Sequence, residues 1–193
     1  VSSMAKKLGF DSSITVDGTD SSGTPWMTVA SKFPTDVSDD KLALASIGQG
    51  DTVVTPLQNA LIAAAVANDG KLMQPTLVDR VRSSDLSVVS QTKSEVMSRP
   101  FSADTADKLT QMMEAVVTKE DPELAIDGVH VAVKTGTAQI GENNGSVDAW
   151  VIGFAPADDP KIAVSVVVHN VDSYGALAAG PIMKAMMQEA LAE

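Results

Sequence analysis

The 193-residue sequence contains no cysteine, which excludes disulfides, thiolate metal sites and a cysteine nucleophile together. Aromatic residues make up only 4% of the chain, and 14 Lys and Arg residues stand against 25 Asp and Glu residues, so the formal net charge is −11. Because an acidic surface repels phosphate backbones, we expect no nucleic-acid partner. No apolar run reaches the length of a membrane-spanning helix, and the longest candidate, 57–67, is predicted to be a core helix.

The residues that are present suffice for one globular domain with a sizeable core. Hydrophobic residues make up 44% of the chain, which is ordinary for a folded protein. Helical patterns come first and strand patterns last, so we expect an α+β fold with an antiparallel sheet flanked by helices. The expected division is a mainly helical part over 1–120 and a sheet with a C-terminal helix over 121–193. The start at Val1, without a signal-peptide pattern, predicts an excised piece of a longer protein.

Two helices are predicted in the first part. Thr55-Pro56-Leu57-Gln58 has the pattern of a capping box with proline at the first helical position, and apolar residues follow at helical spacing up to 67. A second helix is expected over 102–118, with one apolar stripe formed by Leu109, Met112, Met113, Val116 and Val117. The polar stretch 11–36 is predicted to be a long loop pinned by Trp26, and 77–89 a short hairpin.

The last third has the periodicity of strands. Residues 129–133 alternate between apolar and other side chains, and 149–155 and 162–168 are two further apolar runs, which together predict an antiparallel meander. A final helix over 181–191 is expected to pack on this sheet through one side made of Ile182, Met183, Met186, Met187, Ala190 and Leu191. The methionine pairs 112–113 and 186–187 are interpreted as core residues rather than as a binding groove.

Lys134-Thr135-Gly136-Thr137-Ala138 is predicted to lie at the end of the first of these strands. Lys-Thr-Gly is a signature of serine acyl-transferases that act on penicillins and D-Ala-D-Ala peptides, but three residues alone are weak evidence. Further segments strengthen it, in the expected order: 47–50, 54–58 and 67–70 upstream, and 149–156 downstream. Together they resemble the C-terminal part of the transpeptidase domain of class B penicillin-binding proteins, over essentially the whole chain.

The resemblance implies a penicillin-binding or serine β-lactamase-like fold and a serine D,D-transpeptidase that cross-links peptidoglycan stem peptides. The expected partners are the D-Ala-D-Ala peptide and β-lactam antibiotics, with no cofactor and no metal. Lys134 and Thr137 are implied as catalytic, through a positive charge and through a backbone N–H for the oxyanion. Lys134, Thr135 and Thr137 would bind the substrate carboxylate, and Gly136 would leave room for the substrate to lie against the exposed strand edge as an added strand. The hairpin tip 141–145 would border the cleft.

Two motifs of that family, Ser-x-x-Lys and Ser-x-Asn, would supply the nucleophile and relay protons. Ser-x-Asn does not occur, and Ser-x-x-Lys occurs at Ser3, Ser38 and Ser90. We reject all three, because in the family both motifs precede the segment that begins this chain. Ser38 has the pattern of a helix cap, and Ser90 is predicted to lie in a polar loop. The chain is therefore expected to be inactive alone.

An incomplete domain implies further partners and a location. We expect the N-terminal part of the same domain to complete the site. Without it, one exposed sheet edge would permit self-association. Enzymes of this family work on the extracytoplasmic face of the cell membrane, anchored through an N-terminal segment that these residues do not include.

Four other residues near the motif were weighed for a role. A Ser-His-Asp triad would need His130 or His169 beside a serine and a carboxylate. His130 is predicted to share the strand and the face of Lys134, but a structural role is favoured, and His169 is interpreted as a polar strand end. Trp150 is expected to pack under the strand of Lys134, and Asp148 to be an outer partner of the site.

Three alternatives remain open. A serine β-lactamase relative would need a base for a deacylating water, and segments 48–50 and 55–58 favour the biosynthetic enzyme over it. A non-catalytic module could keep the sheet to bind a peptide or a partner protein. An unrelated scaffold domain would leave the ordered family-like segments unexplained.

Overall fold

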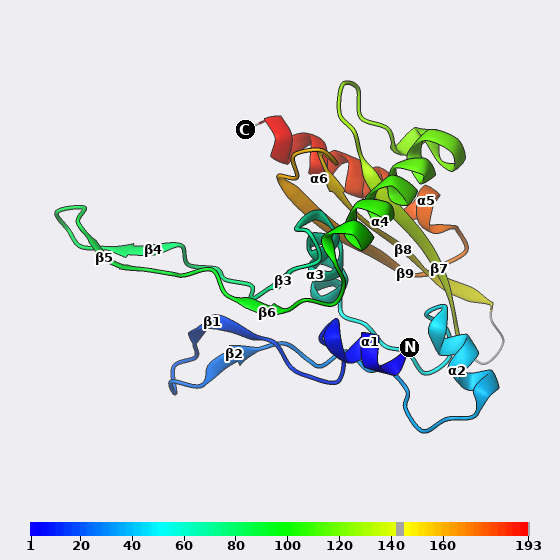
Figure 1. Ribbon diagram of the computed structural model, residues 1–193, viewed down its shortest axis with the longest axis horizontal. Coiled ribbons are helices and arrows are strands. Elements are labelled where there is room, and N and C mark those ends of the chain that lie inside the picture. Colours follow the sequence, from blue (N-terminus) through cyan, green and yellow to red (C-terminus); the bar gives the residue numbers. More distant parts are fainter. Residues whose placement is uncertain (142–144, 193) are drawn as a thin grey trace.

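A computed structural model describes residues 1–141 and 145–192 of the chain. The fold is α+β, as predicted, and helices and strands alternate through its first two thirds (Figure 1). In chain order the elements are α1 (Ser2–Lys7), β1 (Thr15–Thr19), β2 (Pro25–Met27), α2 (Asp39–Ser46), α3 (Pro56–Ala67), β3 (Leu72–Met73), β4 (Arg80–Arg82), β5 (Val88–Gln91), β6 (Val96–Ser98), α4 (Ala103–Ala115), a π-helical turn (Val116–Glu120), a 3-10 turn (Pro122–Leu124), β7 (Ala132–Ile140), β8 (Ser146–Ala155), β9 (Ile162–Val171), α5 (Gly175–Ala178) and α6 (Gly180–Ala192).

The predicted antiparallel meander is confirmed as a three-stranded sheet with the order β7-β8-β9. Strands β7 and β8 pair without a break from Ala132 opposite Phe154 to Ile140 opposite Ser146. Because β8 lies in the middle, β7 forms one edge of this sheet, and none of the strands within residues 1–141 and 145–192 pairs with its outer side. That edge carries the Lys-Thr-Gly motif.

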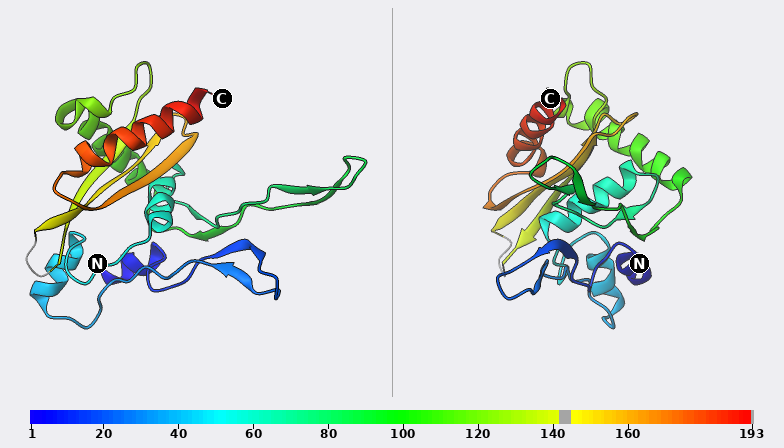
Figure 2. Two further views of the ribbon diagram at one scale, coloured as in Figure 1. Left: turned by 180° about the vertical axis from the view of Figure 1, so that it is seen from behind. Right: turned by 90° about the vertical axis from the view of Figure 1, so that its left-hand side faces the viewer.

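Helices cover both faces of the sheet (Figure 2). Alternate residues of a strand point to opposite faces, so Ala132 and Phe154 pack with residues of α3 and α4, including Val66 and Met113. On the other face, Val133, Val151 and Val164 form a core with Met183 and Met187 of α6, and all of these side chains are buried. The sheet is therefore the middle layer between α3–α4 and α5–α6.

The predicted starts of the two helices α3 and α4 are confirmed by N-terminal capping contacts. The Thr55 hydroxyl accepts a hydrogen bond from the Gln58 N–H at 3.1 Å, with Pro56 as the first helical residue of α3. At the start of α4, the Ser102 hydroxyl accepts from the Thr105 N–H at 3.2 Å. These caps satisfy backbone donors that have no partner inside the helix.

The prediction that both methionines of each pair, 112–113 and 186–187, are core residues is wrong for one member of each pair. Met113, Met183 and Met187 are buried as expected, but Met112 is 62% exposed and Met186 is 48% exposed, as is Ile182 at 46%. The reason is geometric: adjacent residues of a helix differ by about 100° in direction, so when one methionine of each pair points into the core, its neighbour is turned toward solvent. The predicted single apolar sides of α4 and α6 are therefore narrower than the sequence indicated.

Two hairpins project from the body as long arms (Figures 1 and 2). The hairpin predicted within 77–89 is confirmed as β4 and β5, with its strands extending to Gln91. The prediction of a loop over 11–36 is wrong, because β1 and β2 pair there and Trp26 lies in β2, 49% exposed, with its ring against Gly18. The two arms meet at their bases, where the Asp17 carboxylate accepts from the backbone N–H groups of Leu77 and Val78.

Candidate active site

The Lys134–Thr137 motif lies in the middle of β7 rather than at a strand end, which corrects the sequence prediction. The pairing with β8 continues through Lys134 opposite Ile152 and Thr137 opposite Ala149, and ends only at Ile140. Continued pairing holds the whole motif straight along the outer edge of the sheet. Its side chains alternate, so that Lys134 faces α3 and α4 while Thr135 and Thr137 face α5 and α6.

Lys134 borders an apolar cavity of about 750 Å³ between β7 and helices α1, α3 and α4. Its ammonium group donates to the Thr135 carbonyl at 2.6 Å, and its side chain is exposed. The cavity is lined by Met4, Leu8, Ile62, Val66, Phe101, Thr105, Leu109, Met112, Met113, Val116, Glu120, Lys134 and Ile152. Within the described part of the chain, the lining includes no serine, and Lys134 is its one cation.

Thr137 is held by two residues that are distant in the sequence. Its carbonyl accepts from Gln49 Nε2 at 3.3 Å, and its hydroxyl accepts from the Gly175 N–H at 3.3 Å. The residue therefore contacts both the loop after α2 and the start of α5. In the sequence, Gln49 belongs to the family-like segment 48–50, but no local pattern predicts its contact with Thr137 or the contact of Gly175.

A second cavity, of about 560 Å³, lies beside the far half of β7. It is lined mainly by residues 136–140 of the strand and Gly141 after it, by the loop 47–54, and by Asp148 and Trp150 of β8, with Phe10 and Asn59. Trp150 stands directly opposite Gly136, and a Cβ atom at Gly136 would lie 3.4 Å from the Trp150 Cβ. Trp150 was expected to pack under the motif strand, and the structure places it in the adjacent strand of the same sheet instead. Of the predicted hairpin tip, residues 142–144 lie outside the described residues.

The two histidines lie apart from Lys134, and the predicted placement of His130 is wrong. His130 precedes β7, and its side chain is 74% exposed with Nδ1 at 3.6 Å from a Glu114 carboxylate oxygen. His169 lies within β9, and its Nδ1 is 2.6 Å from Asp148 Oδ1. Since the described residues place no serine hydroxyl in a hydrogen bond with either imidazole, this part of the chain holds no Ser-His-Asp triad.

The three Ser-x-x-Lys matches lie on separate elements. Ser3 lies in α1 and Ser38 is the N-cap residue of α2, followed by two acidic residues as predicted. Ser90 lies in β5 of the projecting arm, and not in an irregular loop as its polar neighbours suggested. All three serines are exposed, and so are the lysines three residues later. None of these residues lines the cavity beside Lys134.

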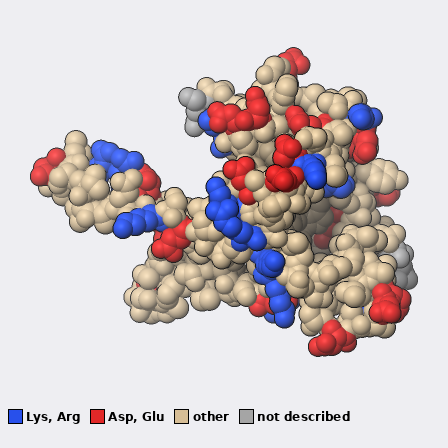
Figure 3. All heavy atoms as spheres, in the orientation of Figure 1, with Lys and Arg blue, Asp and Glu red and all other residues tan. Residues whose placement is uncertain are grey.

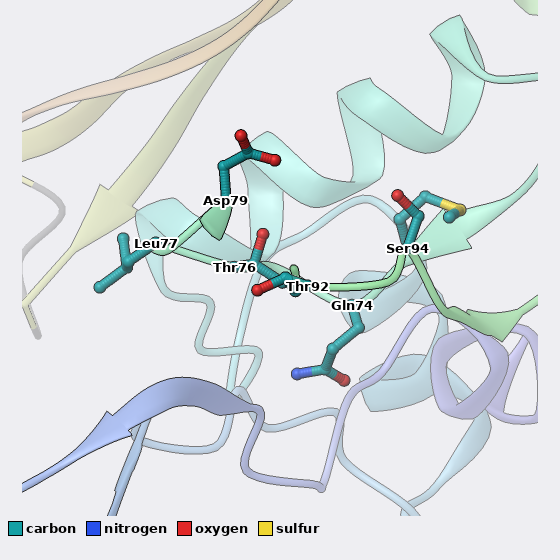
Figure 4. Close-up of a pocket in the computed structure, with 7 residues that line it drawn as sticks. Gln74, Thr76, Leu77, Asp79, Thr92 and Ser94 are labelled. Atoms are coloured by element: carbon teal, nitrogen blue, oxygen red, sulfur yellow. The ribbon is translucent and has the colours of Figure 1, made fainter. Parts of the chain in front are cut away.

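The remaining features of the surface do not converge on the motif. Figure 4 shows a cavity of about 300 Å³ at the base of the β4–β5 arm. It contains none of the residues predicted for the site and is lined by Met73, Gln74, Thr76, Leu77, Asp79, Thr92 and Ser94.

The surface charge and the grouping of ionisable side chains do not mark another site. Acidic side chains are spread over the face drawn in Figure 3, with a short row of basic side chains across its middle. Among residues 1–141 and 145–192, no three or more His, Asp or Glu side chains are grouped as a metal site would require, and no helix has the length and apolarity to cross a membrane.

The described motif can be compared with known proteins. The sequence matches the family described as the penicillin binding protein transpeptidase domain over residues 1–188, nearly the whole chain. The chain belongs to this transpeptidase family. Its relatives include the peptidoglycan D,D-transpeptidase PbpA of Mycolicibacterium smegmatis, 43% identical over 158 residues, and PbpA of Mycobacterium tuberculosis, 41% identical over 156 residues. These alignments cover 79% and 78% of this chain and 32% of each relative, so the chain spans about a third of the length of these transpeptidases.

Solved structures of the same family confirm the fold. The crystal structure of PBPA from M. tuberculosis superposes with a TM-score of 0.85 at 39% identity, covering 98% of this chain and 45% of that one. A ceftriaxone acyl-enzyme complex of the same M. tuberculosis protein superposes with a TM-score of 0.86 at 37% identity, covering 98% of this chain and 42% of that one. The predicted class of fold and the predicted family are therefore both confirmed.

Proposed function

We propose that these 193 residues are the C-terminal part of a serine D,D-transpeptidase domain that cross-links peptidoglycan stem peptides and is acylated by β-lactams. The observation that carries the proposal is the position of Lys134–Thr137 on the outer edge strand of the sheet. An unpaired edge can bind an extended peptide as an added strand. The acyl-enzyme complexes known for a relative that superposes on this chain support the same chemistry.

The roles of the motif residues follow from the directions in which their side chains point from β7. Lys134 places a positive charge beside the edge of a protein with a net charge of −11, so it attracts a carboxylate that the rest of the surface repels. Thr135 and Thr137 offer hydroxyl groups from the opposite face of the same strand. Gly136 lies between them without a side chain, which lets the substrate backbone approach the strand.

The backbone N–H of Thr137 is the group that we assign to the oxyanion. In an antiparallel pair, the N–H and C=O groups of one residue point to the same side. The Thr137 carbonyl accepts from Gln49, which lies outside the sheet, so this carbonyl points away from β8. The N–H of Thr137 then points to the outer edge as well, where it can donate to the oxygen of an acylating carbonyl.

We place the nucleophile and its base outside these 193 residues. A nucleophile and its base must lie beside the substrate, whereas Ser3, Ser38 and Ser90 lie on three separate elements and are exposed to water. No serine lines the cavity beside Lys134 among the described residues. By this proposal the 193-residue chain is inactive alone, and the division at residue 120 into a helical part and a sheet part remains a prediction.

The apolar cavity beside Lys134 fits the remainder of the domain as its occupant. Its walls are mainly apolar side chains of α1, α3 and α4, and Met112 on its rim is 62% exposed. A lining of this kind is stable when another apolar surface covers it. In the complete enzyme, which acts on peptidoglycan from an anchor on the outer face of the membrane, the preceding part of the domain would cover it. In the isolated chain, a second copy could do so.

Intact-mass measurement after incubation with excess benzylpenicillin tests the proposal. The full-length protein should gain one penicilloyl group, and the 193-residue chain should gain none. Lys134→Ala in the full-length protein should slow acylation by about tenfold or more, since hydrogen bonds to charged groups contribute about 1.5–3 kcal/mol. The control is Lys161→Ala, which removes an exposed lysine paired with Asp159 at 2.7 Å. A stoichiometric adduct on the isolated chain, mapped to Ser3, Ser38 or Ser90, would overturn the proposed location of the nucleophile.

A further inference from the structure

The hydroxyl group of Thr137 accepts a hydrogen bond from a backbone N–H group of another element. The Gly175 N–H, at the start of α5, donates to Thr137 Oγ1 at 3.3 Å across 38 residues of sequence. Thr137 is half-buried and Gly175 is buried, so this contact lies at the boundary between the core and the outer edge of β7. An N–H group in such a position requires an acceptor, and the Thr137 hydroxyl supplies it.

This contact determines what the hydroxyl can do for a substrate. A threonine hydroxyl has one proton to donate and two lone pairs that accept. Because one lone pair accepts from Gly175, the proton of the hydroxyl cannot point toward that N–H and is directed elsewhere. A hydroxyl that already accepts a hydrogen bond is also polarised into a stronger donor.

We propose that Gly175 is a positioning residue, whose backbone N–H orients the Thr137 hydroxyl so that it donates its proton to the carboxylate of the substrate. The inference rests on the proposed function, because it assumes that a carboxylate binds at the edge of β7. It adds a residue outside the motif to the determinants of carboxylate specificity. Gly175 touches no substrate atom and acts only through Thr137.

The position of Gly175 requires glycine. A Cβ atom there would lie 2.3 Å from the Trp150 carbonyl oxygen and 2.5 Å from the Gly136 carbonyl oxygen. Both oxygens belong to the paired strands β7 and β8, so they cannot rotate away as a side chain would. Any side chain at position 175 must therefore move the start of α5 away from the sheet, and the donated N–H moves with it. The absence of a side chain keeps the N–H within reach of Thr137.

The main experiment compares two substrates in the full-length protein: a penicillin with a free carboxylate and its methyl ester. Gly175→Ala should slow acylation by the free acid by about tenfold, at the lower end of the range for one hydrogen bond to a charged group. Acylation by the ester should change little, so the acid-to-ester rate ratio should fall. The control is again Lys161→Ala, which removes an exposed lysine paired with Asp159 at 2.7 Å. Its ratio should stay at the wild-type value.

A double-mutant cycle separates orientation of the hydroxyl from a general loosening of the site. Thr137→Val removes the hydroxyl, and in this background Gly175→Ala should produce no further fall in the acid-to-ester ratio. Additive losses would overturn the inference. An unchanged ratio in Gly175→Ala alone, with normal acylation of the wild type, would also overturn it. A wild-type protein that neither penicillin acylates would refute the proposed function instead.

A second measurement does not depend on the folding of the Gly175→Ala variant. Amide hydrogen exchange at Gly175 should be faster in Thr137→Val, which lacks the acceptor, than in the wild type. Thr137→Ser retains the hydroxyl and should preserve the slow exchange. Equal exchange rates in the Thr137→Val and Thr137→Ser variants would show that the Gly175 N–H has another partner, and would overturn the inference.

Discussion

Two glycines of the central sheet, Gly136 and Gly153, allow the substitution of glycine by alanine to be compared at an open position and at a crowded one. Gly136 lies in β7 opposite Trp150, and Gly153 lies in β8 opposite Val133. Neither has a positive φ, so alanine suits the backbone at both positions. A Cβ atom at Gly136 would lie 3.4 Å from the Trp150 Cβ, an ordinary contact. At Gly153, a Cβ atom would lie 2.5 Å from the Ala132 carbonyl oxygen and 3.3 Å from Met187 Cε.

These contacts predict opposite effects on stability. Replacing glycine by alanine without strain stabilises a protein by about 0.4–1 kcal/mol, because the unfolded chain loses conformational freedom. Gly136→Ala should therefore raise the melting temperature by about 1–4 °C, at about 2–4 °C per kcal/mol for a domain of this size. Overpacking costs about 1–3 kcal/mol, and after the same gain Gly153→Ala should be destabilised by about 1–2 kcal/mol. The melting temperature of that variant should fall by about 2–8 °C.

The same pair separates stability from substrate binding. Circular dichroism of the full-length variants measures the melting temperatures, and acylation by benzylpenicillin measures the site. Gly136→Ala should be folded and yet acylated at least about tenfold more slowly, because its methyl group occupies the space that the substrate backbone needs. Gly153→Ala should be acylated normally below its melting transition. If Gly136→Ala melts as low as Gly153→Ala, the contact argument is wrong; if it is acylated at the wild-type rate, docking along β7 is wrong.

Three further predictions concern the rest of the chain. Phe154→Ala should destabilise the protein by about 3–5 kcal/mol in urea unfolding, since Phe154 is fully buried, and a loss below 1 kcal/mol would contradict this. Thr55→Ala should cost about 1 kcal/mol by removing the cap that accepts from the Gln58 N–H, whereas Thr55→Ser should restore most of it. Hydrogen bonds from the hydroxyls of Ser83 and Ser87 lower the pKa of Asp85 to about 2. The charged carboxylate therefore stabilises the β4–β5 turn fully above the unfolded pKa of 3.8, and this stabilisation is lost as the pH falls through 2. NMR titration of Asp85 should give a midpoint near 2, which should rise toward 3.8 in Ser83→Ala.

Elements with strong local signals were predictable from the sequence. The start of α3 follows from Thr55 and Pro56, because capping depends on residues only three positions apart. The strands β8 and β9 follow from apolar runs bounded by turn residues. The pairing of β1 with β2 was missed, because β1 is mainly polar and contains Gly18, and β2 is only three residues long. Neither strand has an alternating apolar pattern, and the pair is stabilised by contacts such as Trp26 with Gly18.

The sequence by itself determined the family and the motif Lys134–Thr137, because these depend on the identity and order of residues in one segment. The family resemblance implied that the motif lies on an exposed strand edge, but only the tertiary structure decided which strands pair and which one is the edge, since the order of strands in a sheet is not encoded within any one strand. It also decided which groups hold Thr137. Gln49 is 88 residues from Thr137 and Gly175 is 38 residues from it, and such contacts exist only after the loop that follows α2 and the start of α5 have come to lie against β7.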